Sequence, residues 1–252
     1  MTILRNAISD SPRLKRYRKH FEHSYSEGVF TTLNLLKRCP EHVLRIVISS
    51  KGVGNCGVAK IQDQCVRNRI PVETSDKTIE RISTKGSHLA IGVFRKYASH
   101  LAAGRNHVVL VNPRDMGNVG TIIRTMVGFG ITDLALIRPA VDIFDPAIIR
   151  ASMGAVFGLS FEYFNSFEEY GNRFAHNFYP LMTNGRETIG RVRFKEPFAL
   201  IFGNEGAGLP EEYSDTGTTV SIPHNDKIDS LNLSVAAAIA IYESAKPDGP
   251  ME

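Results

Sequence analysis

Cysteine is scarce in this chain of 252 residues, and long apolar runs are missing from it. Its three cysteines, Cys39, Cys56 and Cys65, form no CxxC pair, so the sequence predicts neither a disulfide framework nor a zinc site. The eight histidines show no HExxH spacing, so no metal is expected. No run approaches the roughly 18 apolar residues of a membrane-spanning helix, and the N-terminal stretch lacks the apolar core of a secretion signal. We therefore expect a cytoplasmic protein with no membrane partner.

Positive charge is concentrated near the start of the chain. The formal net charge is only +4, with a pI near 9.0. The first cluster of cations, which stands beside Tyr17 and Phe21, consists of Arg13, Lys15, Arg16, Arg18 and Lys19. Such a cluster can neutralise RNA phosphates while the aromatic rings stack on bases, and we take these five residues as candidate RNA contacts. The alternative is that they form the solvated face of an amphipathic helix.

Short helical and strand patterns alternate along most of the chain. They form one series over residues 28–97 and a second over residues 107–246, with an aperiodic linker at 98–106. The basic arm would occupy residues 1–27, and the tail at 247–252 is expected to fray. Alternation of this kind predicts two α/β domains, and in the second a mostly parallel sheet covered by helices.

Two polar turns follow apolar strand patterns near the C-terminus. The pattern at 198–202 leads into GNEGAGLP (203–210), and the pattern at 218–222 leads into a loop and the segment SLNLS (230–234). Glycines let backbone groups approach a ligand closely, and open α/β sheets bind ligands where strands end. The helix that follows is expected to pack through Leu231, Val235, Ile239 and Tyr242. The alternative is that the glycines only turn corners and that Ser230 and Asn232 only cap this helix.

A third turn lies earlier, in NPRDMGNVGTIIRTMVGFG (112–130). Gly117 and Gly120 permit a tight turn from strand to helix, and Asn118 is expected to be the N-cap. Arg124 would then lie about one and a half turns into the helix, within reach of a phosphate. The chain has neither GxGxxG nor GxxxxGK[ST] at this place, and its densest glycine loop comes late. Both facts weigh against a doubly wound nucleotide-phosphate enzyme.

Together and in this order, the three motifs resemble those of the SpoU-type RNA ribose methyltransferases of the SPOUT superfamily. The resemblance implies an α/β domain whose mostly parallel sheet has helices on both faces and ends in a C-terminal trefoil knot. It also implies a homodimer that binds S-adenosylmethionine in the knot. The sequence departs from the family pattern at Met116, His224 and Asp229, and His224 would alter the wall of the cofactor pocket.

The resemblance assigns site residues position by position. The positions that match the family's catalytic set are Arg124, Asn118, Glu205, Ser230 and Asn232. The positions that match its cofactor contacts are Gly203, Asn204, Glu205, Gly208, Ile222 and Leu231. Arg124 is either the base that takes the hydroxyl proton or an electrostatic clamp, and Glu205 orients Arg124, pins the knot loops or caps a helix.

The first domain resembles, more loosely, the small ribosomal-protein-like substrate-binding domain of the rRNA-directed members. This favours rRNA as the partner. The sequence therefore predicts a transfer of a methyl group from S-adenosylmethionine to a ribose 2′-hydroxyl, most of all in rRNA. A tRNA 2′-O-methyltransferase and a non-catalytic RNA-binding protein on the same fold are the alternatives.

Overall fold

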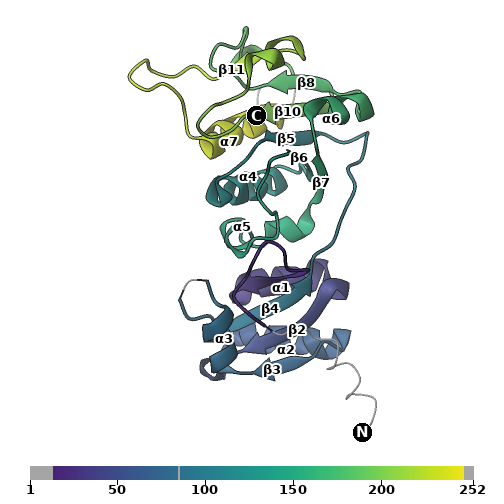
Figure 1. Cartoon of the computed structure of the whole chain (residues 1–252), viewed down its shortest axis with the longest axis vertical. Coiled ribbons are helices and arrows are strands. Elements are labelled where there is room, and N and C mark those ends of the chain that lie inside the picture. Colours follow the sequence, from purple (N-terminus) through teal and green to yellow (C-terminus); the bar gives the residue numbers. More distant parts are fainter. Residues whose placement is uncertain (1–13, 85, 247–252) are drawn as a thin grey trace. The chain divides into compact units, whose positions relative to one another are not determined.

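The computed structural model describes residues 14–84 and 86–246. They form two compact units (Figure 1). The first contains the described residues up to Tyr97 together with Asp142–Phe157, and the second contains Ala98–Val141 and the described residues from Gly158 onward. Among these residues no helix has both the length and the apolar character needed to cross a bilayer.

The first unit is built on a four-stranded sheet in the order β1-β4-β2-β3. β4 is antiparallel to both β1 and β2, whereas β2 and β3 are parallel. The strands are β1 (His23–Glu27), β2 (Val43–Ile48), β3 (Val72–Thr74) and β4 (Ala90–Arg95). The helices are α1 (Val29–Arg38), α2 (Cys56–Asn68), α3 (Asp76–Ile82) and α5 (Pro146–Ala151).

Both faces of this sheet are covered. Successive strand residues point to opposite sides, and each side packs in its own apolar cluster. Ile46 and Ile48 pack in one cluster with Leu36 of α1 and Ile61 of α2. Val47, between them, packs in the other cluster with residues of α3. Continuous apolar stretches in β2 and β4 are therefore what a sheet buried on both faces requires.

A buried carboxylate ties α5 to β1. The Glu27 side chain is fully buried, and one Nη of Arg150 lies 2.9 Å from its Oε2. The backbone N–H and the hydroxyl of Thr84 donate to the same carboxylate at 2.7 and 2.6 Å. Burial alone would raise the pKa of Glu27, but the nearby His88 and the hydrogen bonds from Thr84 outweigh it and hold that pKa below its usual range. The segment that carries α5 is thus an integral part of the first unit.

The second unit is built on a five-stranded sheet in the order β7-β6-β5-β10-β8, in which every neighbouring pair is parallel. Its strands are β5 (His107–Val111), β6 (Asp133–Ile137), β7 (Ser160–Phe164), β8 (Asn177–Pro180) and β10 (Phe198–Phe202). Its helices are α4 (Met116–Gly128), α6 (Phe167–Arg173) and α7 (Leu233–Ser244). The chain builds outward from β5 to β7 and then fills the other side, so the strand order switches direction between β5 and β10. This is the place where open parallel sheets bind ligands.

Helices cover this sheet on both sides (Figure 1). Val109, Ala135 and Ile201 pack in one cluster with Tyr170 of α6. The opposite face, where α4 and α7 lie, also carries fully buried residues. They include Val108, Leu110, Leu134 and Leu200. The expected parallel α/β sheet is therefore present.

The segment at 218–222 adds little to the sheet. It contributes only β11 (Val220–Ser221), which pairs with the two-residue β9 (Glu187–Thr188) and forms a single bridge with Leu181. Gly185 explains the close approach, because a Cβ there would lie 2.4 Å from the carbonyl carbon of Val220. The expectation of a longer strand here was wrong in extent, since only two residues of the segment pair with β9 and the five-stranded sheet does not include it.

α7 also differs from expectation. It buries Ala237, Ala240 and Ile241, whereas Val235 and Tyr242 of the predicted buried face are 47% and 41% exposed. The helix is apolar on nearly every side, so its spacing could not identify the inward face. The small alanines allow it to lie close to its neighbours, and Val235 and Tyr242 remain outside.

A neutral histidine is buried at the start of β5. The Nε2 of His107 lies 2.9 Å from the Ala102 carbonyl oxygen, so this nitrogen carries the proton, and Nδ1 accepts from the Tyr170 hydroxyl at 2.8 Å. Burial lowers the pKa of His107 from 6.5 to about 4, and the nearby ring of His176 adds to the lowering. The folded protein therefore favours the uncharged imidazole.

We predict that the second unit loses stability as the pH falls from about 6.5 towards 4. In that window the unfolded chain binds a proton at His107 that the folded protein excludes, which is worth up to about 3 kcal/mol. Urea unfolding at several pH values should show this slope in the wild type and a flatter one in His107→Gln. His100→Gln, at a side chain that is 80% exposed, should keep the wild-type slope. A slope that is the same in all three proteins would contradict the assignment.

Candidate functional site

The most elaborate loop structure of the second unit lies where β5 and β10 end. The loop after β10 closes on itself, because Asn204 N donates to Gly208 O at 3.1 Å and Gly208 N donates back to Asn204 O at 2.9 Å. The Asn204 Oδ1 accepts from the N–H groups of Gly206 and Ala207 at 3.0 and 3.2 Å. Gly208 has a φ of +69°, a conformation that favours glycine. A Cβ on Gly203 would lie 2.1 Å from the Gly208 carbonyl carbon, so only glycine fits there.

Glu205 connects this loop to the loop after β5. One of its carboxylate oxygens accepts from Asp115 N at 2.9 Å, and both lie within 3.3 Å of Arg114 N. Asn204 supports the same connection by donating to the Asn112 carbonyl oxygen at 2.8 Å. Of the roles that the sequence left open for Glu205, the structure displays that of pinning two loops together. No contact between Glu205 and Arg124 is found among the described residues.

α4 begins earlier than expected. Its N-cap is Asp115, whose carboxylate accepts from Asn118 N at 2.7 Å, so the expectation that Asn118 is the N-cap was wrong. An aspartate three positions earlier supplies the same hydrogen bond with a full charge at the positive end of the helix. Because α4 starts at Met116, Arg124 is its ninth residue and lies about 12 Å along its axis, further than one and a half turns.

The side chain of Asn118 is thereby free to reach the third motif. Its Oδ1 accepts from Asn232 Nδ2 at 3.1 Å, across 114 positions of sequence. Asn232 is at the same time the N-cap of α7, since its Oδ1 accepts from Ser234 N at 2.9 Å and from the Ser234 hydroxyl at 2.7 Å. The structure therefore brings the first and third motifs into direct contact, and Asn232 both caps a helix and joins the site.

Arg124 stands apart from these contacts. It is exposed, together with Gly117 and Thr121 on the same face of α4. Its guanidinium makes no hydrogen bond or ion pair with any side chain or carbonyl in the described part of the chain. A cation in this position remains available to an external anion.

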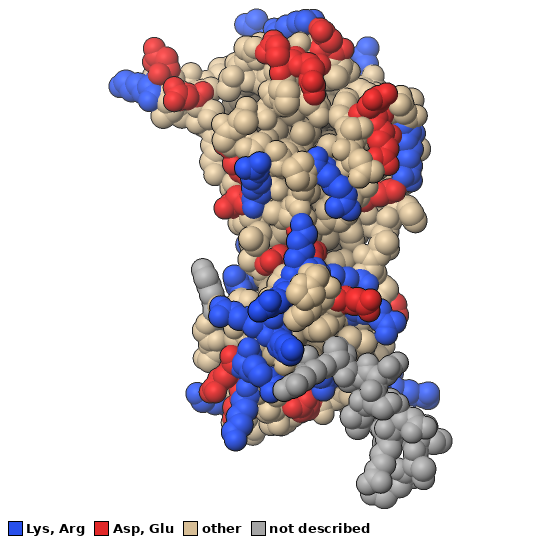
Figure 2. All heavy atoms as spheres, in the orientation of Figure 1, with Lys and Arg blue, Asp and Glu red and all other residues tan. Residues whose placement is uncertain are grey.

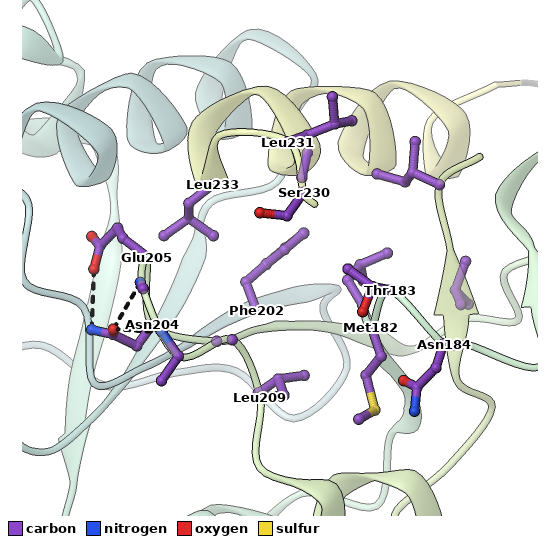
Figure 3. Close-up of a pocket in the computed structure, with 18 of the residues that line it drawn as sticks. Met182, Thr183, Asn184, Phe202, Asn204, Glu205, Leu209, Ser230, Leu231 and Leu233 are labelled. Atoms are coloured by element: carbon purple, nitrogen blue, oxygen red, sulfur yellow. Dashed lines mark hydrogen bonds between the residues drawn. The ribbon is translucent and has the colours of Figure 1, made fainter. Parts of the chain in front are cut away.

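A pocket of about 450 Å³ opens beside the glycine loop. Figure 3 shows Ser230, Leu231 and Leu233 on the α7 side of it, Phe202 and Leu209 opposite, and the 182–184 loop at one end. The six residues that the sequence proposed as cofactor contacts all line it: Gly203, Asn204, Glu205, Gly208, Ile222 and Leu231. Asn118, Asn232 and Arg124 do not line it and belong to the adjoining surface of α4 and α7.

Sequence reasoning missed one wall of this pocket. One end of the pocket is lined by the four residues that follow β8, which are Leu181, Met182, Thr183 and Asn184. The signal in the sequence was partial: polar residues follow this strand, but only the strand order places them at the same sheet edge as the glycine loop. His224 also lines the pocket, and its Nδ1 lies 2.9 Å from the Ile222 carbonyl oxygen.

The comparisons with known proteins point in one direction. The model of the SpoU rRNA Methylase family matches residues 105–242. A 23S rRNA (adenosine(1067)-2′-O)-methyltransferase of Streptomyces azureus is 30% identical over 200 residues, which cover 73% of each chain. A putative tRNA (cytidine(34)-2′-O)-methyltransferase of Listeria innocua is 34% identical over 148 residues, which cover 56% of this chain and 87% of the relative.

Solved structures extend the match over both units. An AdoMet-bound rRNA methyltransferase from Sinorhizobium meliloti has a TM-score of 0.75 and 27% identity, and the match covers 88% of this chain and 87% of the other. Some relatives are longer: the match spans 52% of an uncharacterized tRNA/rRNA methyltransferase of Synechocystis sp..

We predict that Gly203→Ala destabilises the second unit by about 2 kcal/mol, because its Cβ would overlap the backbone of Gly208 and Leu209. Gly206→Ala is the matched control in the same loop. The nearest atom to a Cβ there is 3.6 Å away, and Gly206 is not among the glycines with positive φ. Urea unfolding should separate the two variants clearly. Equal midpoints would show that the loop opens without cost and that Gly203 is not constrained.

Proposed function

Because the chain belongs to the SpoU rRNA methylase family, we propose that it transfers a methyl group from S-adenosylmethionine to a ribose 2′-hydroxyl of RNA. The resemblance found in its three motifs is confirmed by the family match and by 2′-O-methyltransferase relatives. One observation carries the assignment to this chain: its three motifs converge beside one pocket, joined by Asn118 to Asn232 and by Glu205 to the loop at Arg114.

The pocket suits S-adenosylmethionine. Its volume is within the usual range for small-molecule sites, and it combines apolar walls with backbone groups exposed by glycines, as an adenine and ribose require. Leu209, Ile222 and Leu231 would face the base, and the backbone beside Gly203 would approach the nucleoside closely. The close passage of Gly185 against Val220 supports our further proposal that the chain forms the trefoil knot here.

The cofactor supplies a methyl group that is already activated, so the protein mainly has to align the two reactants. Asn118, Asn232 and Ser230 would hold the target ribose next to the pocket. Glu205 acts as a positioning residue, because its carboxylate fixes the loop that begins α4. Arg124 would bind the adjoining phosphate and favour the developing alkoxide electrostatically, since a guanidinium does not give up its proton at neutral pH.

Ribosomal RNA is the better substrate assignment. The 23S rRNA relative and the S. meliloti rRNA methyltransferase match across both units, over 73% and 88% of the chain. Two tRNA relatives, the Listeria innocua protein and a solved protein named for 2-OH methylation of C/U34 on tRNA, match only slightly more than half of it, and the match covers 87% and 95% of their own lengths. The first unit thus has a counterpart in proteins named for rRNA and none in these tRNA relatives. The proposed rRNA substrate also supports a cytoplasmic location.

The first unit would bind the RNA. Lys15, Arg16, Arg18 and Lys19 are exposed, while Arg13 lies outside the described residues. Figure 2 shows Lys and Arg side chains gathered over the visible face of this unit. Exposed cations of this kind contribute affinity through the phosphate backbone with little choice of sequence.

A homodimer completes the proposal. The outer face of α7 presents Val235 and Tyr242 to solvent, and Tyr242 lies beside Phe129, which is 44% exposed. Exposed apolar side chains on adjoining helices are typical of subunit interfaces.

We predict a dimer by light scattering at micromolar concentration. Val235→Asp should shift the protein to monomers, because it places a charge within the apolar contact. Val66→Asp, at an apolar residue that is 79% exposed on α2, should leave the dimer intact. A wild-type protein that is monomeric under these conditions would rule out the dimer.

The decisive test of function is methyl transfer from labelled S-adenosylmethionine to rRNA, with the product mapped by its resistance to alkaline hydrolysis.

We predict that Arg124→Ala lowers turnover on the order of a hundredfold or more while cofactor affinity stays within a few-fold. The guanidinium is exposed and outside the pocket, so cofactor contacts should persist. Near-normal single-turnover rates in the variant would remove Arg124 from the mechanism, and a wild type that neither binds the cofactor nor methylates RNA would disprove the proposed function.

A further inference from the structure

A second hollow lies in the same unit and shares no lining residue with the first. It has a volume of about 500 Å³ and is lined by the start of β8, by residues near 216–218 and by the segment from Arg191 to Lys195. Three of its lining residues are cations, Arg191, Arg193 and Lys195, and one, Glu187, is a carboxylate. The hollow is therefore positively charged.

The segment Arg191–Val192–Arg193–Phe194–Lys195, here called the 191–195 strip, presents its cations on one side. The three cations are exposed, and the apolar residues between them are half-buried. Arg191 ends the 3-10 helix Ile189–Arg191, and the chain continues from it with an extended backbone at Val192. The two-residue period of exposure is that of an extended chain. At about 3.3 Å per residue, successive cations stand roughly 6.6 Å apart along the strip.

The strip is held in place without using the charged ends of its side chains. The Tyr179 hydroxyl donates to the Arg193 carbonyl oxygen at 3.3 Å and accepts from Lys195 N at 3.0 Å. Asn177 donates to the Lys195 carbonyl oxygen at 2.9 Å, and the ring of Phe194 packs 4.8 Å from that of Tyr179. Backbone bonds and one buried ring thus fix the segment.

The charged groups of the strip are unpaired within the part of the chain that the structure describes. Nearby, by contrast, Arg186 is 3.5 Å from Asp215 and so has a partner. Three unpaired cations on a rigid backbone carry a standing electrostatic cost, which an external polyanion would relieve. Their spread along a strip fits a chain of phosphates better than a single small anion, which would need donors that converge on one point.

The strip lies near the proposed methyl-transfer pocket. β8 contributes Asn177 and Tyr179 to the hollow, and the residues that directly follow it, from Leu181 to Asn184, line the pocket. On the other side, Thr218 lines the hollow and Val220 lines the pocket. Two chain segments thus run from the hollow to the wall of the pocket, with only a few residues between them.

We propose that Arg191, Arg193 and Lys195 bind the sugar-phosphate backbone of the RNA substrate where it extends beyond the target nucleotide. This inference rests on the proposed function, because it takes RNA as the substrate. It gives the second unit an RNA contact of its own, separate from the cations of the first unit. Because phosphate contacts carry no sequence information, the strip contributes affinity and register rather than base choice.

The test is binding of a fluorescein-labelled RNA hairpin to the full-length protein over a range of KCl concentrations. Changing all three strip cations to Gln should weaken binding on the order of tenfold at low salt and reduce the slope of log Kd against log salt by about 2 to 3. Affinity for S-adenosylmethionine should not change. The variant Arg191→Lys, Arg193→Lys, Lys195→Arg keeps the charges and should keep most of the slope.

A second control separates local contact from net charge. Arg138, Arg173 and Lys246 are exposed on the second unit outside the strip, each already contacts a partner there, and changing them to Gln removes the same formal charge. An equal loss of slope in this control would overturn the proposal. An unchanged slope in the strip variant, with RNA and cofactor still bound, would also overturn it and leave the proposed function standing. If the wild type binds no RNA, both fall.

Discussion

The carboxylate of Glu205 is the contact on which the candidate site depends. Parallel strands that meet at a switch point bring two loops together, and each loop carries backbone N–H groups that no strand can satisfy. Glu205, from the loop after β10, accepts the N–H groups of Arg114 and Asp115 in the loop after β5. Hydrogen bonds to a charged acceptor are among the strongest available to a protein. Asp115 then caps α4, which sets where Asn118 and Arg124 project.

The environments of the site residues differ in a way that matters for chemistry. The pocket is walled by apolar side chains and glycine backbone, whereas Arg124 is exposed to water. An exposed charge stabilises a developing negative charge weakly, because water screens it. If the chain acts on RNA as proposed, the nucleic acid must itself cover Arg124, so the substrate completes the low-dielectric environment in which the guanidinium is effective.

Much of this arrangement follows from the sequence, and the exceptions have physical causes. The parallel sheet was predictable because strand patterns and glycine turns are local signals. The pocket-lining residues around Gly203 and Leu231 were assigned by the resemblance of the motifs to the family, and they line the pocket. The wall formed by Met182 to Asn184 was not predicted, since only the strand order shows that β8 ends beside the glycine loop. The prediction of which face of α7 is buried was wrong, because the sequence of a helix that is apolar on every side does not show which side packs inward.

The contact between Glu27 and Arg150 makes the first unit discontinuous in the chain. α5 belongs to the first unit, but during synthesis it emerges only after β5, α4 and β6 of the second unit. Until Arg150 is available, the carboxylate of Glu27 has only His88 and Thr84 as partners among the described residues. The finished fold buries this carboxylate completely, and a buried carboxylate that lacks a charged partner is costly. The first unit can therefore reach its final stability only after two of the five strands of the second unit's sheet have been made. A fragment cut at the linker would lack a piece of its own interior.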